Sequence, residues 1–96
     1  MFALLVYDID QSDGGKRLRR VAKECEQYGI RVQHSVFELD IHEADLTRLE
    51  SQVLQIIDSE KDSVRVYRIG KITDRQIKIL GHREQVEIGK DDAFFL

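Results

Sequence analysis

The feature that most constrains the fold of this chain is an apolar run near its start. Residues 2–7 (FALLVY) are apolar at both even and odd positions, and the run stops at Asp8. Successive side chains of a strand point to opposite faces of a sheet, so this pattern predicts a central strand that is covered on both sides. The chain has 96 residues, which is enough for one compact domain. We therefore expect residues 1–96 to form a single domain built around this strand.

Two later segments have the apolar spacing of amphipathic helices. The first begins at Lys16, and Gly29 supplies the expected C-terminal stop. The second extends over about residues 43–58, with apolar side chains on one face and acidic side chains on the other. The sequence therefore predicts two helices that each bury one face.

Further strands are indicated between and after these helices. Residues 30–41 are rich in β-forming side chains but change parity near Val36, which indicates a bulge, a bend or a very tight hairpin. Residues 63–69 alternate as a strand, residues 71–83 are ambiguous, and residues 85–88 are compatible with a short last strand.

This order of elements predicts an α+β fold, a ferredoxin-like βαββαβ sandwich with an extra C-terminal strand. Both helices would lie on one face of the sheet, which leaves the other face without a cover. Because the first strand is apolar on both faces, we expect a second copy of the sheet to pack there in a two-fold homodimer.

The charge of the chain is unevenly distributed. The formal net charge is -3, but residues 16–23 carry five cations and no acidic side chain. These cations are Lys16, Arg17, Arg19, Arg20 and Lys23. On a helix, Arg19, Arg20 and Lys23 cluster and Lys16 lies one turn earlier, which predicts a cationic ridge. The ridge either contacts phosphate groups, in a manner independent of base sequence and sensitive to salt, or is an ordinary solvated face.

Asp8 is the candidate metal-binding or catalytic residue. It lies where the buried strand enters a loop, and Asp10 and Asp13 follow closely. The spacing excludes an EF-hand, because the sixth loop position is Asp13 where glycine is needed and the twelfth is Arg19 where glutamate is needed. Mg²⁺ keeps several waters and needs only one or two carboxylates, so Asp8 is compatible with Mg²⁺. The alternative is that Asp8 is an ordinary acidic residue of a turn.

The glycines before the first helix also allow two interpretations. Gly14, Gly15 and the backbone N–H groups that follow would cradle a phosphate, since a helix N-terminus is partly positive. A phosphate-binding P-loop, however, requires glycine at the position of Asp10 and serine or threonine at that of Arg17. A flexible turn into the helix explains the same residues.

Other residues carry no catalytic signal. Cys25 is the only cysteine, which excludes an intramolecular disulfide, and its place on the apolar stripe predicts a small core residue. His34, His42 and His82 lack the spacing of metal ligands. The apolar run at residues 2–7 is too short for a signal peptide or a membrane span. We therefore expect a soluble, cytoplasmic protein with no membrane partner.

Three motifs, taken together, resemble those of the CRISPR-associated protein 2 family. They are VYDI at residues 6–9, KRLRRVAK at residues 16–23 and YGIRVQHSVFE at residues 28–38. The stretch DSVRVYRIG at residues 62–70 extends the resemblance, which then covers most of the chain.

This resemblance implies a ferredoxin-like homodimer that joins CRISPR integrase subunits and helps to insert fragments of foreign DNA as new spacers. It also implies a Mg²⁺-dependent endonuclease for RNA or double-stranded DNA, with Asp8 of each protomer as the metal-binding and catalytic residue. Arg17, Arg20 and Arg31 would then hold the phosphate backbone. Asp10 would support the metal site without binding the metal directly.

We also make structural predictions for Phe37 and for the C-terminal tail. Phe37 matches the Ser-Val-Phe stretch of the family, and we expect it to be a core or interface residue without a chemical role. The apolar tail at residues 93–96 (AFFL) is expected to dock on the partner subunit or on the integrase, with docking on its own chain as the alternative.

Three functions are compatible with these residues. They are a catalytic nuclease, a non-catalytic scaffold that bridges integrase subunits and supports a DNA duplex, and a stand-alone, toxin-like ribonuclease of the same fold. We favour the scaffold as the physiological role, because no general base other than the aspartates is evident. The presence of Asp8 keeps the nuclease interpretation open.

Overall fold

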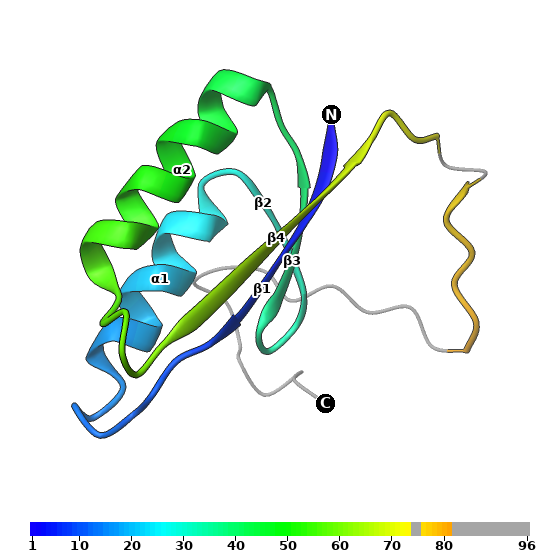
Figure 1. The fold of residues 1–96 in the computed structure, drawn as a ribbon. Coiled ribbons are helices and arrows are strands. Elements are labelled where there is room, and N and C mark those ends of the chain that lie inside the picture. Colours follow the sequence, from blue (N-terminus) through cyan, green and yellow to red (C-terminus); the bar gives the residue numbers. More distant parts are fainter. Residues whose placement is uncertain (74–75, 82–96) are drawn as a thin grey trace.

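The computed structural model describes residues 1–73 and 76–81 (Figure 1). The helices and strands occur in the expected order: β1 (Phe2–Asp8), α1 (Lys16–Glu26), β2 (Gly29–Gln33), β3 (Val36–Asp40), α2 (Glu43–Ile56) and β4 (Ser63–Gly70). Within the ambiguous segment, residues 71–73 and 76–81 form neither an α-helix nor a β-strand. The expected short strand at residues 85–88 and the apolar tail at residues 93–96 lie outside the described residues.

The described strands form one antiparallel sheet in the order β2-β3-β1-β4. β1 is an inner strand that pairs with β3 on one side and with β4 on the other. α1 and α2 lie side by side and cover the same face of this sheet (Figure 1). The ferredoxin-like βαββαβ arrangement predicted from the sequence is therefore confirmed.

The two helices are amphipathic, as their spacing predicts. The buried side chains are Val21, Ala22 and Cys25 on α1 and Leu46, Leu49 and Val53 on α2. α2 ends at Ile56, two residues before the expected end. Across the described parts of the chain, no helix combines the length and the apolar character needed to cross a membrane.

One face of β1 forms the centre of the hydrophobic core. Ala3 and Leu5 are completely buried and Tyr7 is 4% exposed, because alternate side chains of the strand point toward the helices. β3 contributes Phe37 and Leu39, both completely buried. The predictions that Cys25 and Phe37 are core residues are confirmed, since neither side chain reaches solvent.

Gly29 has a different role from the one expected. α1 ends at Glu26 with Gln27 as its C-cap, and Gly29 is the first residue of β2 and not the stop of the helix. A Cβ atom at Gly29 would collide with the side chain of Leu39 and with the backbone carbonyl of Glu38 on the neighbouring β3. Glycine is required here because the two backbones approach closely, a tertiary constraint that helix patterning does not reveal.

The parity change in residues 30–41 is a tight hairpin combined with a register shift. β2 and β3 are joined by the turn at His34 and Ser35, and the pairing shifts between Arg31 and Gln33. Tyr7 of β1 holds this turn in place. Its backbone N–H donates to the Ser35 carbonyl at 3.0 Å and its hydroxyl donates to the His34 carbonyl at 2.8 Å.

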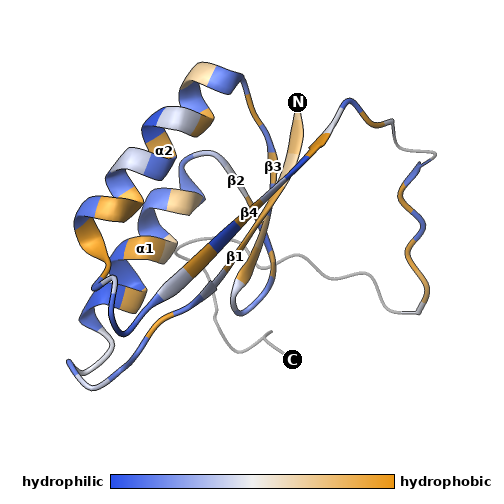
Figure 2. Ribbon diagram, viewed as in Figure 1, coloured by the Kyte–Doolittle hydropathy of each residue, from blue (hydrophilic) through white to orange (hydrophobic). Residues whose placement is uncertain are grey.

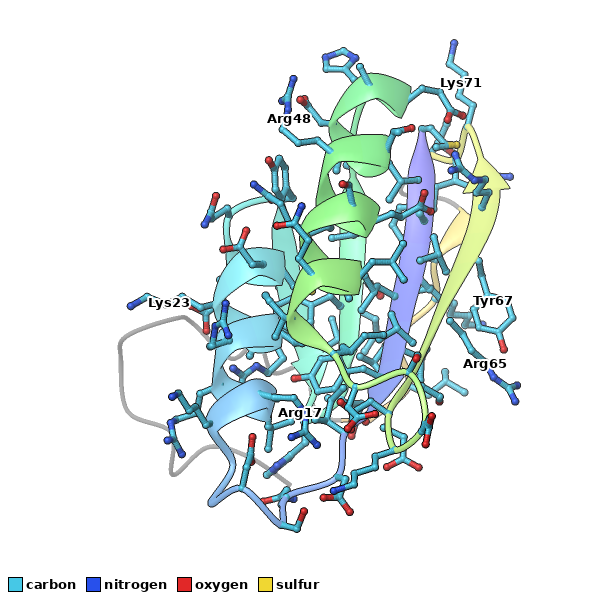
Figure 3. All side chains as sticks on the ribbon, turned by 60° about the vertical axis from the view of Figure 1, so that its left-hand side comes forward. Arg17, Lys23, Arg48, Arg65, Tyr67 and Lys71 are labelled. Carbon is cyan, nitrogen blue, oxygen red and sulfur yellow. The ribbon has the colours of Figure 1, made fainter. Side chains whose placement is uncertain are left out.

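The opposite face of the sheet is not covered by α1 or α2. Leu4 and Val6 of β1 point to this face and are half-buried, and β4 adds Arg65 and Tyr67 beside them. Arg65 and Tyr67 project away from the helices in Figure 3. β1 carries apolar colouring in Figure 2, and its even-numbered residues Leu4 and Val6 form an apolar strip on this face. We call this side of the sheet, which α1 and α2 do not cover, the open face.

Candidate nucleic-acid interface

A groove of about 960 Å³ lies beside α1. Its walls come from the end of β1, from the outer side of α1 and from the turn between β2 and β3. Most of the site residues predicted from the sequence line it, namely Asp8, Lys16, Arg19, Arg20, Lys23 and Arg31. The fold therefore brings together predicted site residues that are up to 23 positions apart in the chain. Arg17 is the predicted site residue that does not line the groove.

Four of the lining residues form the cationic ridge, which we define as Lys16, Arg19, Arg20 and Lys23. All four are exposed, because the apolar stripe of α1 faces the sheet and turns the remaining positions outward. Lys23 projects from α1 on the side away from α2 (Figure 3). Arg19 also donates to the carbonyl of Gly14 at 3.0 Å, which leaves it anchored but exposed. The ridge is a cationic surface that any anion in the groove would meet.

Asp8 is the last residue of β1 and is exposed. It pairs with Ser63 of β4 and has the same parity as Leu4 and Val6, so the alternation of the strand directs its side chain to the open face. Because Asp8 is the last residue of the strand, it also lines the groove beside α1. In the described part of the chain, no group of three His, Cys, Asp or Glu side chains could hold a metal ion. Within the described residues of one protomer, Asp8 thus belongs to no such group, which suits a cation that keeps most of its waters.

Asp10 and Asp13 are occupied within their own loop. Asp10 accepts hydrogen bonds from the backbone N–H of Ser12 at 2.9 Å and from the Ser12 hydroxyl. Asp13 accepts from the backbone N–H groups of Gly15, Lys16 and Arg17 at 2.9 to 3.0 Å. The first N–H groups of α1 therefore already have a carboxylate partner, which favours the turn interpretation of the glycines over a phosphate cradle.

Arg17 points away from the groove and into a buried ion pair. Its Nε donates to Asp62 Oδ2 at 2.8 Å, and the Asp62 side chain is completely buried. The Arg17 hydrogen bond, reinforced by the backbone N–H groups of Asp58 and Asp10, holds the pKa of Asp62 well below its usual range despite burial. Asp62 therefore remains ionised at neutral pH.

Arg31 lines the groove but is largely buried. Its Nη2 lies 3.2 Å from Glu26 Oε2, and the guanidinium lies over the Phe37 ring, 5.6 Å from the ring centroid. The ion pair and the cation–π contact keep Arg31 at the base of the groove. Arg31 contributes positive charge there from a fixed position.

Two further titratable side chains near the groove are held protonated. Burial raises the pKa of the Tyr7 phenol to about 12 and the pKa of the Cys25 thiol to about 12. Neither group therefore serves as a base or nucleophile at neutral pH.

Sequence reasoning missed Asp62 and His34. Residues 58–62 looked like a charged turn, and nothing in the local pattern distinguishes Asp62 from its acidic neighbours. His34 lines the same groove as Asp8, because the hairpin turn is held against Tyr7 near the end of β1. Both positions depend on contacts between distant segments of the chain. The role of Asp62 becomes visible only when the fold shows that it pairs with Arg17.

The ion pair between Arg17 and Asp62 predicts an acid-sensitive contribution to stability. In the unfolded chain an aspartate has a pKa of about 3.9, and in the folded protein that of Asp62 is lower. The stabilisation is therefore fully present above the unfolded-state pKa of about 3.9. It is lost as the pH falls from there toward the lower pKa of Asp62 in the folded protein. The free energy of unfolding of the wild type should exceed that of Asp62→Asn at pH 7, and the difference should shrink toward pH 3.

Urea denaturation from pH 3 to pH 7 checks this prediction. Asp45→Asn is the matched control, because Asp45 forms an exposed ion pair with Arg48 on α2. Its effect should not exceed about 0.5 kcal/mol at any pH. A difference between the wild type and Asp62→Asn that stays constant over the whole pH range would contradict the prediction.

Comparison with known proteins identifies the family. The family model described as "CRISPR associated protein Cas2" matches residues 1–77. The "CRISPR-associated endonuclease Cas2" of Halalkalibacterium halodurans is 41% identical over 90 residues, which are 92% of this chain and 94% of the relative. The "CRISPR-associated endoribonuclease Cas2 1" of Moorella thermoacetica is 41% identical over 84% of this chain and 86% of the relative.

Solved structures show the same similarity. The crystal structure of Streptococcus pyogenes Cas2 at pH 6.5 is 43% identical, with a TM-score of 0.73 over 84% of this chain and 100% of that one. A hypothetical protein from Thermus thermophilus is 28% identical, with a TM-score of 0.69 over 84% of this chain and 90% of that one. Because the family model covers most of the sequence and these relatives match over most of their own length, the chain belongs to the CRISPR-associated Cas2 family.

Proposed function

We propose that this protein is a homodimer of the CRISPR adaptation machinery that binds nucleic acid along α1 and cleaves phosphodiester bonds at Asp8 with Mg²⁺. The observation that carries the proposal is that Asp8 and the cationic ridge line one groove. The names of the relatives, endonuclease and endoribonuclease, agree with it. RNA and double-stranded DNA are both substrates that this surface chemistry would accept.

The cationic ridge would bind the phosphate backbone. Its side chains are exposed, and no acidic residue occurs among residues 16–23. Contacts of this kind neutralise phosphates, release counterions and carry no information about base sequence. Arg31 would add charge at the base of the groove, and His34 lies close enough to line the same wall.

Asp8 would hold the Mg²⁺ ion. Mg²⁺ binds through one or two carboxylates and completes its shell with water and phosphate oxygens, which suits the exposed carboxylate of Asp8. Mg²⁺ bound there would supply positive charge to the scissile phosphate and make water a better nucleophile. The chain's own residues orient the substrate, since the ridge positions the phosphate backbone beside the end of β1.

A second copy of the chain would complete both the core and the site. Leu4 and Val6 present an apolar strip on the open face, and Asp8 lies on that face at the end of the same strand. A two-fold partner packed sheet to sheet would cover the strip and bring its own Asp8 to the same surface. The dimer would also provide the bridge between integrase subunits.

A non-catalytic scaffold, which the sequence favours as the physiological role, is the second candidate function, because the groove shared by Asp8 and the cationic ridge supports cleavage. The observation in favour of the scaffold is that the described residues of one protomer contain no group of three His, Cys, Asp or Glu side chains that could hold a metal ion. In this case the duplex would lie on the cationic ridge without being cut, and the integrase subunits would perform the chemistry.

Replacement of Asp8 separates the two functions. Asp8→Asn keeps the size of the side chain but removes its charge, so Mg²⁺-dependent cleavage of labelled RNA or duplex DNA should fall about 100-fold or more. Asp40→Asn is the matched control, because Asp40 is an exposed aspartate on the open face at the other end of the sheet. It should cleave as the wild type does, and a chelator should abolish cleavage by both.

The same variant then distinguishes nuclease from scaffold in cells. Spacer acquisition that survives Asp8→Asn, together with lost cleavage, supports a scaffold role for which cleavage is dispensable. Loss of both activities would refute that role. Cleavage that is absent or independent of metal in the purified wild-type protein would contradict the nuclease proposal.

Charge reversal on the ridge tests nucleic-acid binding. The double variant Arg19→Glu/Arg20→Glu should weaken duplex binding for all sequences alike and reduce the slope of log affinity against log salt by about one for each phosphate that is no longer bound. Arg48→Glu reverses an exposed arginine on α2, outside the groove, and should change neither quantity. Fluorescence anisotropy at several salt concentrations measures both, and unchanged binding by the double variant would refute the ridge.

The dimer predicted for the open face is tested with matched leucines. Leu4→Glu places a charge in the apolar strip and should shift the protein from dimer to monomer, because burying an unpaired carboxylate is costly. Leu54→Glu changes a leucine on α2 that is 69% exposed and should leave the mass unchanged. Light scattering coupled to gel filtration distinguishes the two, and a dimeric Leu4→Glu protein would rule out this packing.

A further inference from the structure

One buried carboxylate joins three segments that are distant in the sequence. The side chain of Asp62, in the turn between α2 and β4, accepts hydrogen bonds from the backbone N–H of Asp10 and from that of Asp58, both at 2.8 Å. It also accepts from Arg17 Nε at 2.8 Å and from Arg17 Nη2 at 3.3 Å. Asp62 therefore ties the loop after β1 and the first turn of α1 to the start of β4.

The guanidinium of Arg17 also makes several hydrogen bonds within the chain. Besides its two bonds to Asp62, Nη2 donates to the backbone carbonyl of Asp10 at 3.3 Å and Nη1 donates to Asp13 Oδ2 at 3.1 Å. Its side chain is 17% exposed and lies between α1 and the α2–β4 turn (Figure 3). Four of the five N–H groups of the guanidinium are thus directed at atoms of the same chain.

The charges around Arg17 do not favour a phosphate. Three carboxylates lie within 4 Å of its guanidinium, those of Asp10, Asp13 and Asp62. These three carboxylates already surround the guanidinium, and Arg17 does not line the groove. Arg17 therefore differs from its neighbours Arg19 and Arg20, which are exposed and do line it.

This cluster controls the place where β1 ends. Asp8 pairs with Ser63, the residue that follows Asp62, and Asp10 is held directly by the Asp62 carboxylate. We propose that the Arg17–Asp62 ion pair is a positioning pair, which fixes Asp8 and the start of the cationic ridge relative to each other without touching the nucleic acid. The inference rests on the proposed function for what is positioned, and it replaces a phosphate contact by Arg17 with an internal one.

Salt-dependent binding distinguishes these two roles for Arg17. If Arg17 only positions, Arg17→Gln leaves the slope of log affinity against log salt as in the wild type, whereas Arg20→Gln reduces it by about one. A slope reduced equally in both variants would overturn the proposal. Fluorescence anisotropy with a labelled duplex gives these slopes.

Catalytic constants test the positioning of Asp8. Asp62→Asn and Arg17→Lys should each lower kcat by about tenfold, as is common for residues that orient a metal ligand, with KM within about twofold of the wild type. Arg17→Lys is informative because lysine keeps the charge but loses the forked geometry. The double variant should be no worse than either single variant, since both remove the same ion pair. Wild-type kcat in both single variants would overturn the proposal.

A control and a second readout separate positioning from loss of fold. Ile41→Val trims the core at the opposite end of the sheet and should lower the denaturation midpoint without lowering kcat. Amide hydrogen exchange should increase at residues 8–16 in Asp62→Asn and not in Ile41→Val. Unchanged exchange at these residues in Asp62→Asn would overturn the proposal.

The exchange experiment also keeps the two proposals distinguishable. If the wild-type protein cleaves no nucleic acid, the nuclease function fails, and the salt slopes and the exchange of residues 8–16 still decide whether Arg17 and Asp62 form a positioning pair. If the wild type cleaves and Asp62→Asn is normal in kcat and exchange, the nuclease stands and the positioning pair fails.

Discussion

The central place of β1 determines where the other parts of the molecule lie. Its odd-numbered residues are buried against α1 and α2, so its even-numbered residues must point to the open face. Asp8 continues the even series at the end of the strand, which puts a carboxylate on the same face as the apolar strip of Leu4 and Val6. In the proposed homodimer, packing on that face would cover the apolar strip and bring two copies of Asp8 to one surface.

The net charge of the chain hides a separation between its two helices. The exposed side of α1 carries the cationic ridge, whereas α2 carries acidic side chains, two of which, Glu43 and Glu50, hold Arg68 of β4. An anion approaching the molecule therefore meets opposite fields on the two helices. A protein with a formal charge of -3 can still attract phosphate, because the charge that matters is local to the groove.

The arginines divide into two groups by their surroundings. Arg17 and Arg31 are largely buried and paired with carboxylates of the same chain, so they stabilise the segments that border the groove. Arg19 and Arg20 are exposed on it. Removing a member of the first group leaves a buried charge unpaired, whereas removing one of the second lowers the positive charge of the groove and leaves no buried charge behind. Arginines of one helix thus have different surroundings, with Arg17 in an internal ion pair and Arg19 and Arg20 on the exposed surface of the groove.

The local pattern of the sequence was sufficient to predict the helices and strands and to indicate the candidate surface. The apolar run of β1, the helical stripe of α1 and the acid-free residues 16–23 are properties of short segments, and hydrophobic periodicity depends only on residues a few positions apart. They determined the ferredoxin-like order of elements, the core roles of Cys25 and Phe37, and Asp8 as the residue at a strand end. What only the tertiary structure decided is how distant segments meet: Gly29 against β3, and Arg17 with the buried Asp62. The physical reason is that burial and ion pairing depend on which surfaces the fold brings into contact, and residues 45 positions apart leave no local trace of that contact.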